Sequence, residues 1–554
     1  MHLAALTVFV GLAAARRLDV SWNVGYVQVN RDGHSMRTAI GVNGALPVAP
    51  IYADQGDTLY LHVHNSLNKT TSIHAHGILQ TGSNFMDGAA MVTQCGIPPG
   101  DSFTYQVVLN QTGTFWIHGH DHDELADGLR APLIIRDAAP PYQYDGEYVL
   151  AFEDWYTAMF DERMDETLDP TKPFPPPPSF PYALINGVNA NYTETMRFAA
   201  DSVYRVRLVN MATTEWFKFS MPGHEMHVIE ADGVYSDPFL TDGLTIAPGQ
   251  RYSVLVRAHA SDRLNYQYLV EIYASFIPRL AGLNPRYHAG LIEYQKDAPL
   301  VGSDKEELLD QLPEDVPLAW NWDIELKALS RQPVLPVTRQ IEIVIGGALF
   351  SDGITRDLIN NVSYVPPKVP TLYSALSLGD LANNASLYGP NSNVIVIDHM
   401  EYVELLIQNP SRLPHPIHLH MTTFQVVEYG PASDDVIISQ GATPPKIPAP
   451  VRSFDRWPME RDTIVVPPMQ YAKVRFHAQD GFVAYGHCHL QVHLRMGMAF
   501  TLVVAPDVMQ KTMTIPPSMY ELCRKQGIPI TGNAAGNPGA DMSGLPQEPF
   551  IVSH

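Results

Sequence analysis

The feature that most constrains this chain is an alternation of apolar and polar side chains with a period of two residues. In the segment 57–64, Leu59, Leu61 and Val63 fall on one face, because successive side chains of an extended strand point to opposite sides. The segments 252–256, 402–408, 471–476 and 499–504 alternate in the same way. The 46 prolines favour loops and sheet edges over long helices. The pattern predicts an all-β fold of short strands.

Three turns with related sequences indicate that one structural unit is repeated. They contain Pro98, Pro248 and Pro467, and each precedes an alternating segment. A chain of 554 residues also exceeds the usual size of one domain. We therefore predict three β-sandwich domains over residues 18–138, 139–320 and 321–554, the last of which includes a C-terminal tail.

Helices and irregular segments are predicted at only a few places. Helical patterns occur at 304–312 and 517–526. The run of prolines at 173–181 cannot form a helix or a central strand, so it predicts a surface excursion from the second domain. Residues 301–336 are charged and interrupted by prolines, which predicts a connection between the second and third domains.

The N-terminus predicts secretion. Residues 3–15 form an apolar run that ends in small side chains, which is typical of a signal peptide over residues 1–17, although a buried N-terminal strand is the alternative. No later stretch reaches the ~20 apolar residues of a membrane helix, so we predict no membrane anchor. Five glycosylation sequons fit a glycoprotein of the secretory route, in the extracellular space or the cell wall: Asn68, Asn110, Asn191, Asn361 and Asn384.

The composition excludes several classes of function. Lys and Arg number 36 against 58 Asp and Glu, and a net charge of −22 argues against nucleic acid or an anionic membrane as partner. The chain has 22 histidines and only 3 cysteines, which rules out a disulfide scaffold and a zinc-ribbon array. The chemistry therefore depends on where the histidines gather.

Four short segments concentrate histidine: His74 with His76, His118 with His120, His415 with His418 and His420, and His487 with His489 and His493. In a strand, the His-x-His spacing directs both imidazoles to one side. His62 and His64 have this spacing without a companion motif, and we interpret them as an ordinary surface pair. Two of the four segments belong to the first domain and two to the third, which predicts a shared site. Imidazole-rich ligation with little thiol suits copper better than structural zinc.

The segment around Cys488 predicts a second kind of copper site. Cys488 precedes His493 and Met498, and with one more histidine these make the His₂Cys set with a weak axial Met of an electron-transfer copper site. Neighbours in a strand point to opposite sides, so His487 and His489 would face another metal centre behind the thiolate. Cys488 would thus connect two metal sites covalently.

At this point the sequence resembles the multicopper oxidases, in particular their fungal laccase-like and ferroxidase-like branch. The likeness covers residues 20–536, with all four copper motifs in order. Segments typical of the branch are 84–88, 92–95, 127–130 and 532–536. The resemblance implies three cupredoxin-like Greek-key sandwiches and four copper ions, one of type 1, one of type 2 and a type 3 pair.

The resemblance also implies a role for each motif residue. The type 1 copper would take His415, Cys488, His493 and axial Met498, and the type 2 copper His74 and His418. The type 3 coppers would take His76, His118 and His489, and His120, His420 and His487. Asp87 matches the family's proton-supplying acid. The family also commonly bridges a cysteine at the position of Cys95 to one at that of Cys523.

Several positions depart from the family pattern. Relatives carry an acid where this chain has Gln491, so proton supply would fall to another group, and Glu124 stands where relatives have Gln. Met421 and Thr422 replace a usual Gly-His pair. The carboxylates of iron-uptake ferroxidases correspond approximately to Pro177 and Ser411, which predicts the loss of a tight Fe(II) site, since this hard cation prefers carboxylate oxygens.

These departures lead to a functional prediction. We expect a laccase-like oxidase that couples one-electron oxidation of small phenolic or aromatic molecules, in pigment or secondary-metabolite formation, to the four-electron reduction of O₂ to water. The alternative enzyme is a secreted ferroxidase that oxidises Fe(II). An alternative of another class is a non-catalytic cupredoxin electron carrier or copper store, against which the six type 3 histidines argue.

Overall fold

The structure is a computed structural model that describes residues 15–171, 182–189, 194–261, 263–272, 287–301, 325–454 and 456–545. Several sequence predictions lie outside the described residues. They are the signal-peptide residues 1–14, the proline run at 173–181 with Pro177, the sequon at Asn191 and the helix at 304–312.

The first sandwich consists of two four-stranded sheets, in the orders β2-β1-β4-β6 and β3-β8-β7-β5. The alternating face predicted at 57–64 is found in β4, where Leu59, Leu61 and Val63 are buried. The N-terminal strand β1 pairs with β4 in parallel. The strands are β1 Arg17–Val29, β2 Arg37–Val42, β3 Ile51–Asp54, β4 Thr58–Asn65, β5 Ile73–His76, β6 Ser102–Val108, β7 Gly113–Gly119 and β8 Arg130–Arg136.

The second sandwich has a six-stranded and a five-stranded sheet, in the orders β10-β9-β12-β17-β14-β15 and β11-β19-β18-β13-β16. A short helix, α1 Phe160–Thr167, follows β9. The strands are β9 Gly146–Trp155, β10 Tyr182–Ile185, β11 Thr195–Arg197, β12 Val203–Asn210, β13 Phe217–Ser220, β14 Met226–Ala231, β15 Val234–Thr241, β16 Gly243–Ile246, β17 Arg251–Arg257, β18 Tyr266–Ile272 and β19 Tyr287–Glu293.

The third sandwich pairs a seven-stranded sheet, β21-β20-β23-β29-β25-β26 with β27 beside β25, with the five-stranded sheet β22-β31-β30-β24-β28. Its strands are β20 Arg339–Leu349, β21 Thr355–Ile359, β22 Val394–Ile397, β23 Tyr402–Asn409, β24 His415–Leu419, β25 Phe424–Pro431, β26 Arg452–Ser453, β27 Glu460–Arg461, β28 Thr463–Val466, β29 Gln470–His477, β30 Phe482–Cys488 and β31 Ala499–Val504. Its helices are α4 Thr371–Ser377, α5 Asp434–Ser439, α6 Gln491–Arg495, α7 Pro506–Thr512 and α8 Pro517–Arg524, the last of which confirms the helix predicted at 517–526.

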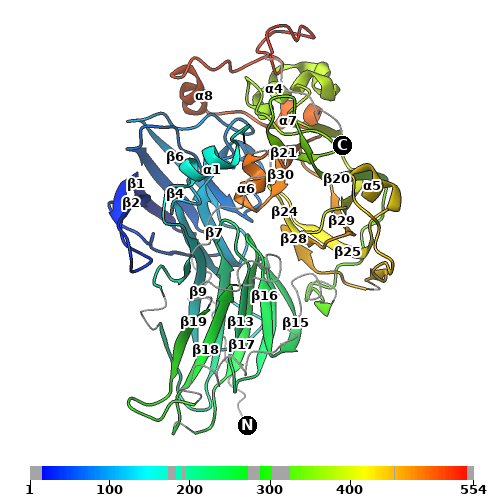
Figure 1. The fold of residues 1–554 in the computed structure, drawn as a ribbon. Helices are drawn as coiled ribbons and strands as arrows, with labels where there is room; N and C mark the ends of the chain where they lie inside the picture. Colours follow the sequence, from blue (N-terminus) through cyan, green and yellow to red (C-terminus); the bar gives the residue numbers. More distant parts are fainter. Residues whose placement is uncertain are drawn as a thin grey trace, which may run out of the picture.

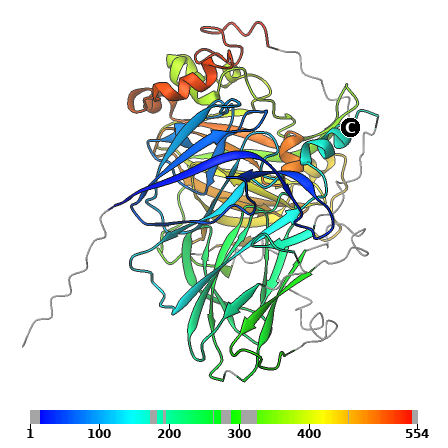
Figure 2. The ribbon, with the colours of Figure 1, turned by 90° about the vertical axis from the view of Figure 1, so that its left-hand side faces the viewer.

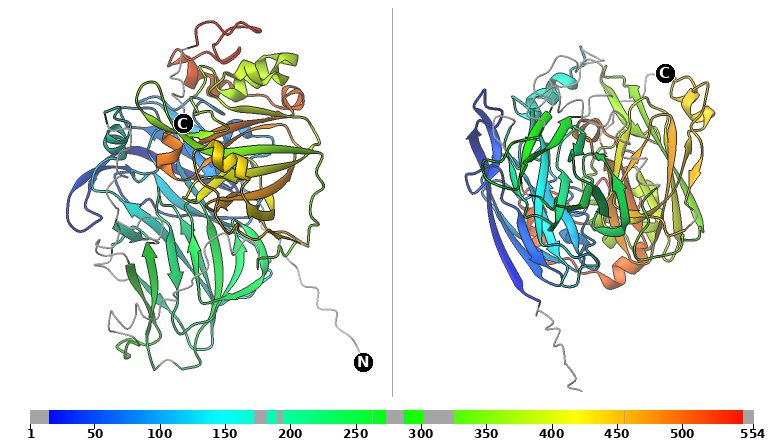
Figure 3. Two further views of the ribbon diagram at one scale, coloured as in Figure 1. Left: turned by 45° about the vertical axis from the view of Figure 1, so that its right-hand side comes forward. Right: turned by 90° about the horizontal axis from the view of Figure 1, so that it is seen from below.

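The three sandwiches are arranged so that the first and third lie beside each other and the second extends from both (Figures 1 and 2). The view from below in Figure 3 shows the same order, with the blue first sandwich and the yellow third sandwich on either side. One apolar core runs from Ile117 and Leu129 of the first sandwich to Tyr485 and Leu522 of the third part of the chain. The predicted all-β fold is confirmed. Within the described residues, no helix is long and apolar enough to cross a membrane.

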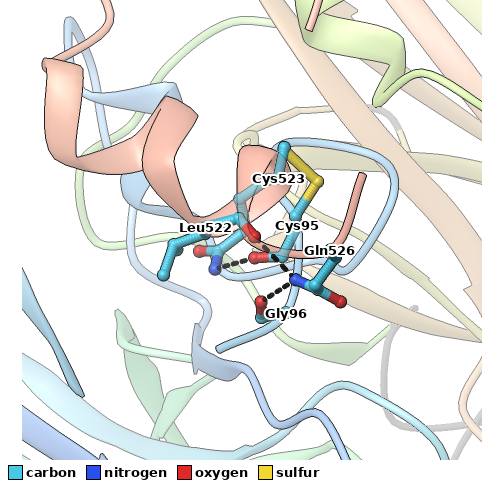
Figure 4. The surroundings of a disulfide bond; sticks show 6 residues. Cys95, Gly96, Leu522, Cys523 and Gln526 are labelled. Atoms are coloured by element: carbon cyan, nitrogen blue, oxygen red, sulfur yellow. Dashed lines mark hydrogen bonds between the residues drawn. A yellow bond between two sulfur atoms is a disulfide. The ribbon is translucent and has the colours of Figure 1, made fainter. Parts of the chain in front are cut away.

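A disulfide joins the first sandwich to α8, as the resemblance implied (Figure 4). It links Cys95 to Cys523 across 428 residues of sequence. Beside it, the side-chain amide of Gln526 donates to the carbonyls of Gly96 and Leu522, each at 2.8 Å. The disulfide therefore links the first sandwich covalently to the segment that follows the third.

We expect Cys523→Ser to destabilise the protein by about 2–5 kcal/mol. Without the disulfide, the unfolded chain gains conformational entropy, which favours unfolding. The measurement is the denaturant midpoint of unfolding under oxidising conditions. Cys95→Ser should cause the same shift, and the double variant should add nothing further, since both remove one bond. Midpoints that stay at the wild-type value in both single variants would contradict the expectation.

Candidate metal centre

The four predicted histidine segments lie on strands that meet where the first and third sandwiches face each other. Strands β5 and β7 of the first sandwich, and β24 and β30 of the third, end at this contact. The segments lie on these strands or immediately after them. The two histidines of each His-x-His pair are two residues apart, so their side chains point to the same side. We call the eight residues that gather there the histidine cluster: His74, His76, His118, His120, His418, His420, His487 and His489.

The histidine cluster divides into three groups in which the possible ligand nitrogens lie within 4.8 Å of one another. Each group draws on both sandwiches. The groups are His74 with His76 and His418, His76 with His118 and His489, and His120 with His420 and His487. Neither sandwich alone can therefore build any of these sites.

Hydrogen bonds to backbone carbonyls fix which nitrogen faces the cluster in four of the eight rings. Nδ1 of His74 donates to the Asp87 carbonyl at 2.8 Å, and Nδ1 of His418 to that of Asp462 at 2.9 Å. His118 and His487 make the same kind of bond to the carbonyls of the next residue, each at 3.0 Å. A proton on Nδ1 leaves Nε2 with its lone pair, which is the form that binds a metal.

Most of these lone pairs have no hydrogen-bond partner among the described residues, whereas Nε2 of His487 lies 3.3 Å from Nε2 of His420. Within the described chain, the Nε2 atoms of His74, His118, His120 and His418 are buried and make no hydrogen bond. Burial, together with repulsion from neighbouring rings, lowers the pKa of His118 and His120 well below the usual range. The same causes lower the pKa of His487 to about 3. Neutral imidazoles with converging, unsatisfied nitrogens fit metal ions and little else.

A second site, which we call the thiolate cluster, is formed by His415, Cys488 and His493. The Cys488 sulfur lies 3.8 Å from Nδ1 of His415 and 3.5 Å from Nδ1 of His493. Cys488 is the one cysteine outside the disulfide, and burial raises the pKa of its thiol, so the thiolate forms where a bound cation replaces the proton. Met498 is 1% exposed, and its carbonyl accepts the Cys488 N–H at 3.1 Å. A thiolate with two imidazoles fits copper.

The two clusters are joined through Cys488. Its neighbours His487 and His489 belong to two different groups of the histidine cluster. β30 ends at Cys488, and the sulfur packs in the core of the third sandwich while the imidazoles on either side of it join the histidine cluster. Cys488 of the thiolate cluster is therefore directly bonded in the chain to one ligand of the histidine cluster before it and to another after it.

Two of the buried acids that lie against the histidine cluster were expected from the sequence. Asp87 Oδ2 accepts a hydrogen bond from His420 Nδ1 at 2.9 Å, while its Oδ1 is buried without a hydrogen-bond partner among the described residues. Glu124 Oε2 accepts from the Thr71 hydroxyl at 2.9 Å, and burial raises its pKa well above the usual range. A Cβ added to Gly119, between His118 and His120, would lie 2.8 Å from Glu124 Oε2, so the carboxyl lies against this strand.

A cavity of about 460 Å³ connects the histidine cluster to the surface. His118, His120, His487 and His489 line its inner end. At its rim, the Gln491 amide donates to Asp123 Oδ1 at 3.1 Å, and Arg495 pairs with Asp123 Oδ2 at 3.1 Å. Burial raises the pKa of Asp123 to about 7. Asp123 was not predicted as a site residue, although it stands next to Glu124 in a segment that the sequence did single out.

The isolated pair His62 and His64 lies outside both clusters. His62 Nε2 bonds to Asp19 at 2.8 Å, and His64 Nδ1 bonds to the Ser102 hydroxyl at 2.9 Å, on the solvent side of β4. Spacing alone therefore does not identify ligands in this chain.

Comparisons with known proteins agree with this geometry. Three sequence profiles, each described as multicopper oxidase, match residues 23–140, 146–296 and 364–508. Similar curated proteins include the iron multicopper oxidase fer1 of Mycosarcoma maydis, which is 35% identical over 98% of this chain and 89% of the relative. The iron transport multicopper oxidase fetC of Epichloe festucae is 33% identical over 99% and 87%.

Solved structures show the same relationship. The multicopper oxidase Fet3p, described as functioning in iron import, superposes with a TM-score of 0.85 at 29% identity, over 97% of this chain and 100% of that one. A laccase from Botrytis aclada gives 0.75 at 26% identity, over 93% and 92%. These neighbours confirm the cupredoxin-like character of the three sandwiches.

The predicted phenol-oxidising, laccase-like activity in pigment or secondary-metabolite formation is wrong. Relatives named for iron match nearly the whole chain, and the iron-import structure superposes better than the laccase. The prediction gave too much weight to two missing carboxylates. At one of those positions, the Ser411 hydroxyl lies 2.9 Å from His415 Nε2, so a polar contact to this ring remains although the charge is gone.

Proposed function

The chain belongs to the multicopper oxidase family, and from this premise we propose that the reductant it oxidises with O₂ is Fe(II). The observation that carries the proposal is the match of iron-named oxidases along 98% and 99% of the chain. Members of the family hold four copper ions, which take up electrons singly from a reductant and reduce O₂ to water at a type 2 and type 3 cluster.

The proposed ligands follow the groups described above. The thiolate cluster, together with Met498, would hold the type 1 copper. His74 and His418 hold the type 2 copper. The type 3 coppers are held by His76, His118 and His489, and by His120, His420 and His487. The convergence of unpartnered, neutral nitrogens supports this assignment.

Fe(II) gives up its electron at His493 in this proposal. The His493 side chain is half-buried, whereas His415 and Cys488 are buried, so His493 offers the thiolate cluster's edge to solvent. Cys488 then links that edge to His487 and His489 through the backbone. Most of the proposed ligands lie in strands or in α6, and the others, His120, His420, His489 and Met498, directly adjoin a strand.

Protons for water formation come from Glu124 and Asp87. The raised pKa of Glu124 favours the protonated carboxyl, the form that can donate. Asp87 touches His420 and, through its carbonyl, His74, so it lies between the proposed type 2 and type 3 ligands. Gln491 cannot transfer a proton, and its amide is held by Asp123.

The negative charge of Asp357 should tune the type 1 copper. Asp357 lies in β21, its Oδ2 is buried without a hydrogen-bond partner in the described part of the chain, and its charge adds to burial in raising the pKa of Cys488. Burial raises the pKa of Asp357 itself to about 7. The carboxyl is therefore neutral below that pH and ionised above it.

Ionised Asp357 favours the more positive, oxidised copper, so we expect the type 1 reduction potential to fall as the pH rises through about 7. An interaction of ~1 kcal/mol corresponds to roughly 40 mV for one electron. Spectroelectrochemistry of the blue band measures the potential, and Asp357→Asn should remove this step. A step of unchanged size in the Asn variant would contradict the role of Asp357.

The secretory route is also part of the proposal. The four described sequon asparagines, Asn68, Asn110, Asn361 and Asn384, are all exposed, as glycan attachment requires. The disulfide fits an oxidising compartment. Digestion with an endoglycosidase should shift the mass of the protein purified from a eukaryotic host.

Aerobic oxygen uptake tests the substrate. Purified, copper-loaded protein is given Fe(II), a diphenol or ascorbate at equal concentrations, and we expect the highest kcat/KM with Fe(II), with four Fe(II) consumed for each O₂. Fe(II) solutions without enzyme and with Cys488→Ser correct for spontaneous oxidation. A higher kcat/KM with the diphenol would overturn the proposal.

A further inference from the structure

We propose that the second sandwich, which contributes none of the proposed copper ligands, positions two of them through Arg251. The residue ends the turn Pro248-Gly249-Gln250-Arg251 between β16 and β17, one of the three related turns in the sequence. The turn reaches the wall of the histidine cluster. The inference rests on the ligand roles proposed above for His76 and His418.

Asp462 lies between these two histidines, one from each of the other sandwiches. Its Oδ1 accepts a hydrogen bond from Nε2 of His76 at 3.0 Å, and its carbonyl accepts one from Nδ1 of His418 at 2.9 Å. These bonds leave Nδ1 of His76 and Nε2 of His418 to face the cluster. The two rings stack with centroids 3.8 Å apart at 12°. Asp462 therefore sets the orientation of both rings.

Arg251 in turn fixes Asp462. Its two terminal nitrogens donate to the two carboxylate oxygens at 2.7 and 2.6 Å, a two-pronged pairing that sets the plane of the carboxylate. Its Nε donates to the Thr114 carbonyl in β7 at 2.9 Å. The buried Arg251 side chain thus touches the first and third sandwiches from the second.

The other residues of the turn also pack against the histidine cluster. Gly249 has a φ of +86°, and a Cβ there would lie 2.9 Å from His489 Cδ2 and 3.2 Å from His76 Cε1. The Gln250 amide donates to the Thr463 carbonyl at 3.2 Å, next to Asp462. Only glycine leaves room for the two rings here, so the backbone of the second sandwich forms part of the site.

Loss of Arg251 should therefore affect the type 2 and type 3 copper sites but not the type 1 site. Loss of the paired Arg251 bonds frees the Asp462 carboxylate, whose Oδ1 lies 3.0 Å from His76 Nε2 and 3.6 Å from His418 Nδ1. The type 2 and type 3 coppers should therefore bind more weakly. The thiolate cluster lies wholly within the third sandwich, and in the described part of the chain none of its side-chain hydrogen bonds reaches Arg251 or Asp462. The type 1 copper should be unaffected.

The test compares Arg251→Gln and Arg251→Lys with the wild type. The readouts are copper ions per chain, the blue band of the type 1 copper, the near-ultraviolet shoulder of the type 3 pair and the type 2 electron paramagnetic resonance signal. We expect a wild-type blue band with type 2 and type 3 copper affinity reduced about 10- to 100-fold in Arg251→Gln. Arg251→Lys keeps the positive charge but cannot bond to both Asp462 oxygens in the same way. Its loss of type 2 and type 3 copper affinity should be smaller.

The matched control is Arg205→Gln. Arg205 forms a buried ion pair with Glu230 in the same sandwich, so its loss causes comparable destabilisation, but it does not bond to Asp462. The control should keep all copper signals in whatever fraction folds. If Arg251→Gln does not fold, Arg251→Lys alone decides the question.

His418→Gln distinguishes the ligand assignment from the positioning role of Arg251. Its type 2 signal should disappear. Retention of all four coppers and all signals in this variant would overturn the ligand assignment itself. Loss of the type 2 signal in His418→Gln, combined with wild-type type 2 and type 3 signals in every folded Arg251 variant, would overturn the positioning role alone.

Discussion

Cys488→Ser should lose the blue band completely and lower Fe(II) oxidation by more than about 10³-fold, a barrier increase of ~4 kcal/mol. A serine hydroxyl does not supply the soft thiolate that holds the type 1 copper, and the link from His493 to His487 and His489 is then interrupted. Visible absorption, copper content and oxygen uptake with Fe(II) measure the three effects. Copper content should fall by one ion, because the histidine cluster keeps all eight of its side chains.

The control for this variant is Cys523→Ser, which removes the disulfide and leaves the thiolate cluster intact. It should keep the blue band while losing stability. Near-wild-type Fe(II) oxidation in Cys488→Ser would show that electrons reach the histidine cluster by another route. The near-ultraviolet shoulder of the type 3 pair should persist in both variants.

Glu124→Gln should lower turnover under saturating Fe(II) by about 10²- to 10⁴-fold, the usual contribution of a positioned proton donor. The Gln side chain has nearly the same shape and can still accept from Thr71, but it carries no transferable proton. Anaerobic reduction of the blue band by Fe(II) should proceed at the wild-type rate, because only the reaction with O₂ needs the proton. Stopped-flow absorption and oxygen uptake separate the two half-reactions.

The chain offers a rescue experiment for the same prediction. Related enzymes carry an acid at the position of Gln491 and a Gln at that of Glu124, so the double variant Glu124→Gln/Gln491→Glu should recover part of the lost turnover. Glu215→Gln is the control, since Glu215 is a buried acid whose pKa burial raises to about 8 and which has no bond to the histidine cluster in the described structure. Full turnover in Glu124→Gln would remove Glu124 from proton supply.

The strands and the histidines could be predicted because both follow local patterns. The alternation in β4 identifies its buried face, and each His-x-His pair lies on or next to such a strand. That the first and third sandwiches share the ligands could also be predicted, since neither half of the set makes a complete site alone. The resemblance also implied the disulfide, which the structure contains, and Asp87, which bonds to His420 of the cluster.

The Arg251–Asp462 pair could not be predicted, because no local pattern links residues 211 positions apart. An arginine after a turn and an aspartate at the start of a strand each have ordinary surface roles, and only the packing of three sandwiches makes both buried. The substrate prediction failed for a related reason. Missing acids at two positions were read as a missing function, whereas substrate choice depends on the whole region around His493.

The division of the ligands between the two ends of the chain also has a consequence for biosynthesis. The histidine cluster needs residues 74–120 and 418–489, and the disulfide needs residues 95 and 523. A chain emerging from the ribosome cannot assemble these sites until nearly its whole length has been made. The histidine cluster can therefore take up metal only after residue 489 has been made, and a product truncated before Cys488 should show no blue band however well its first sandwich folds.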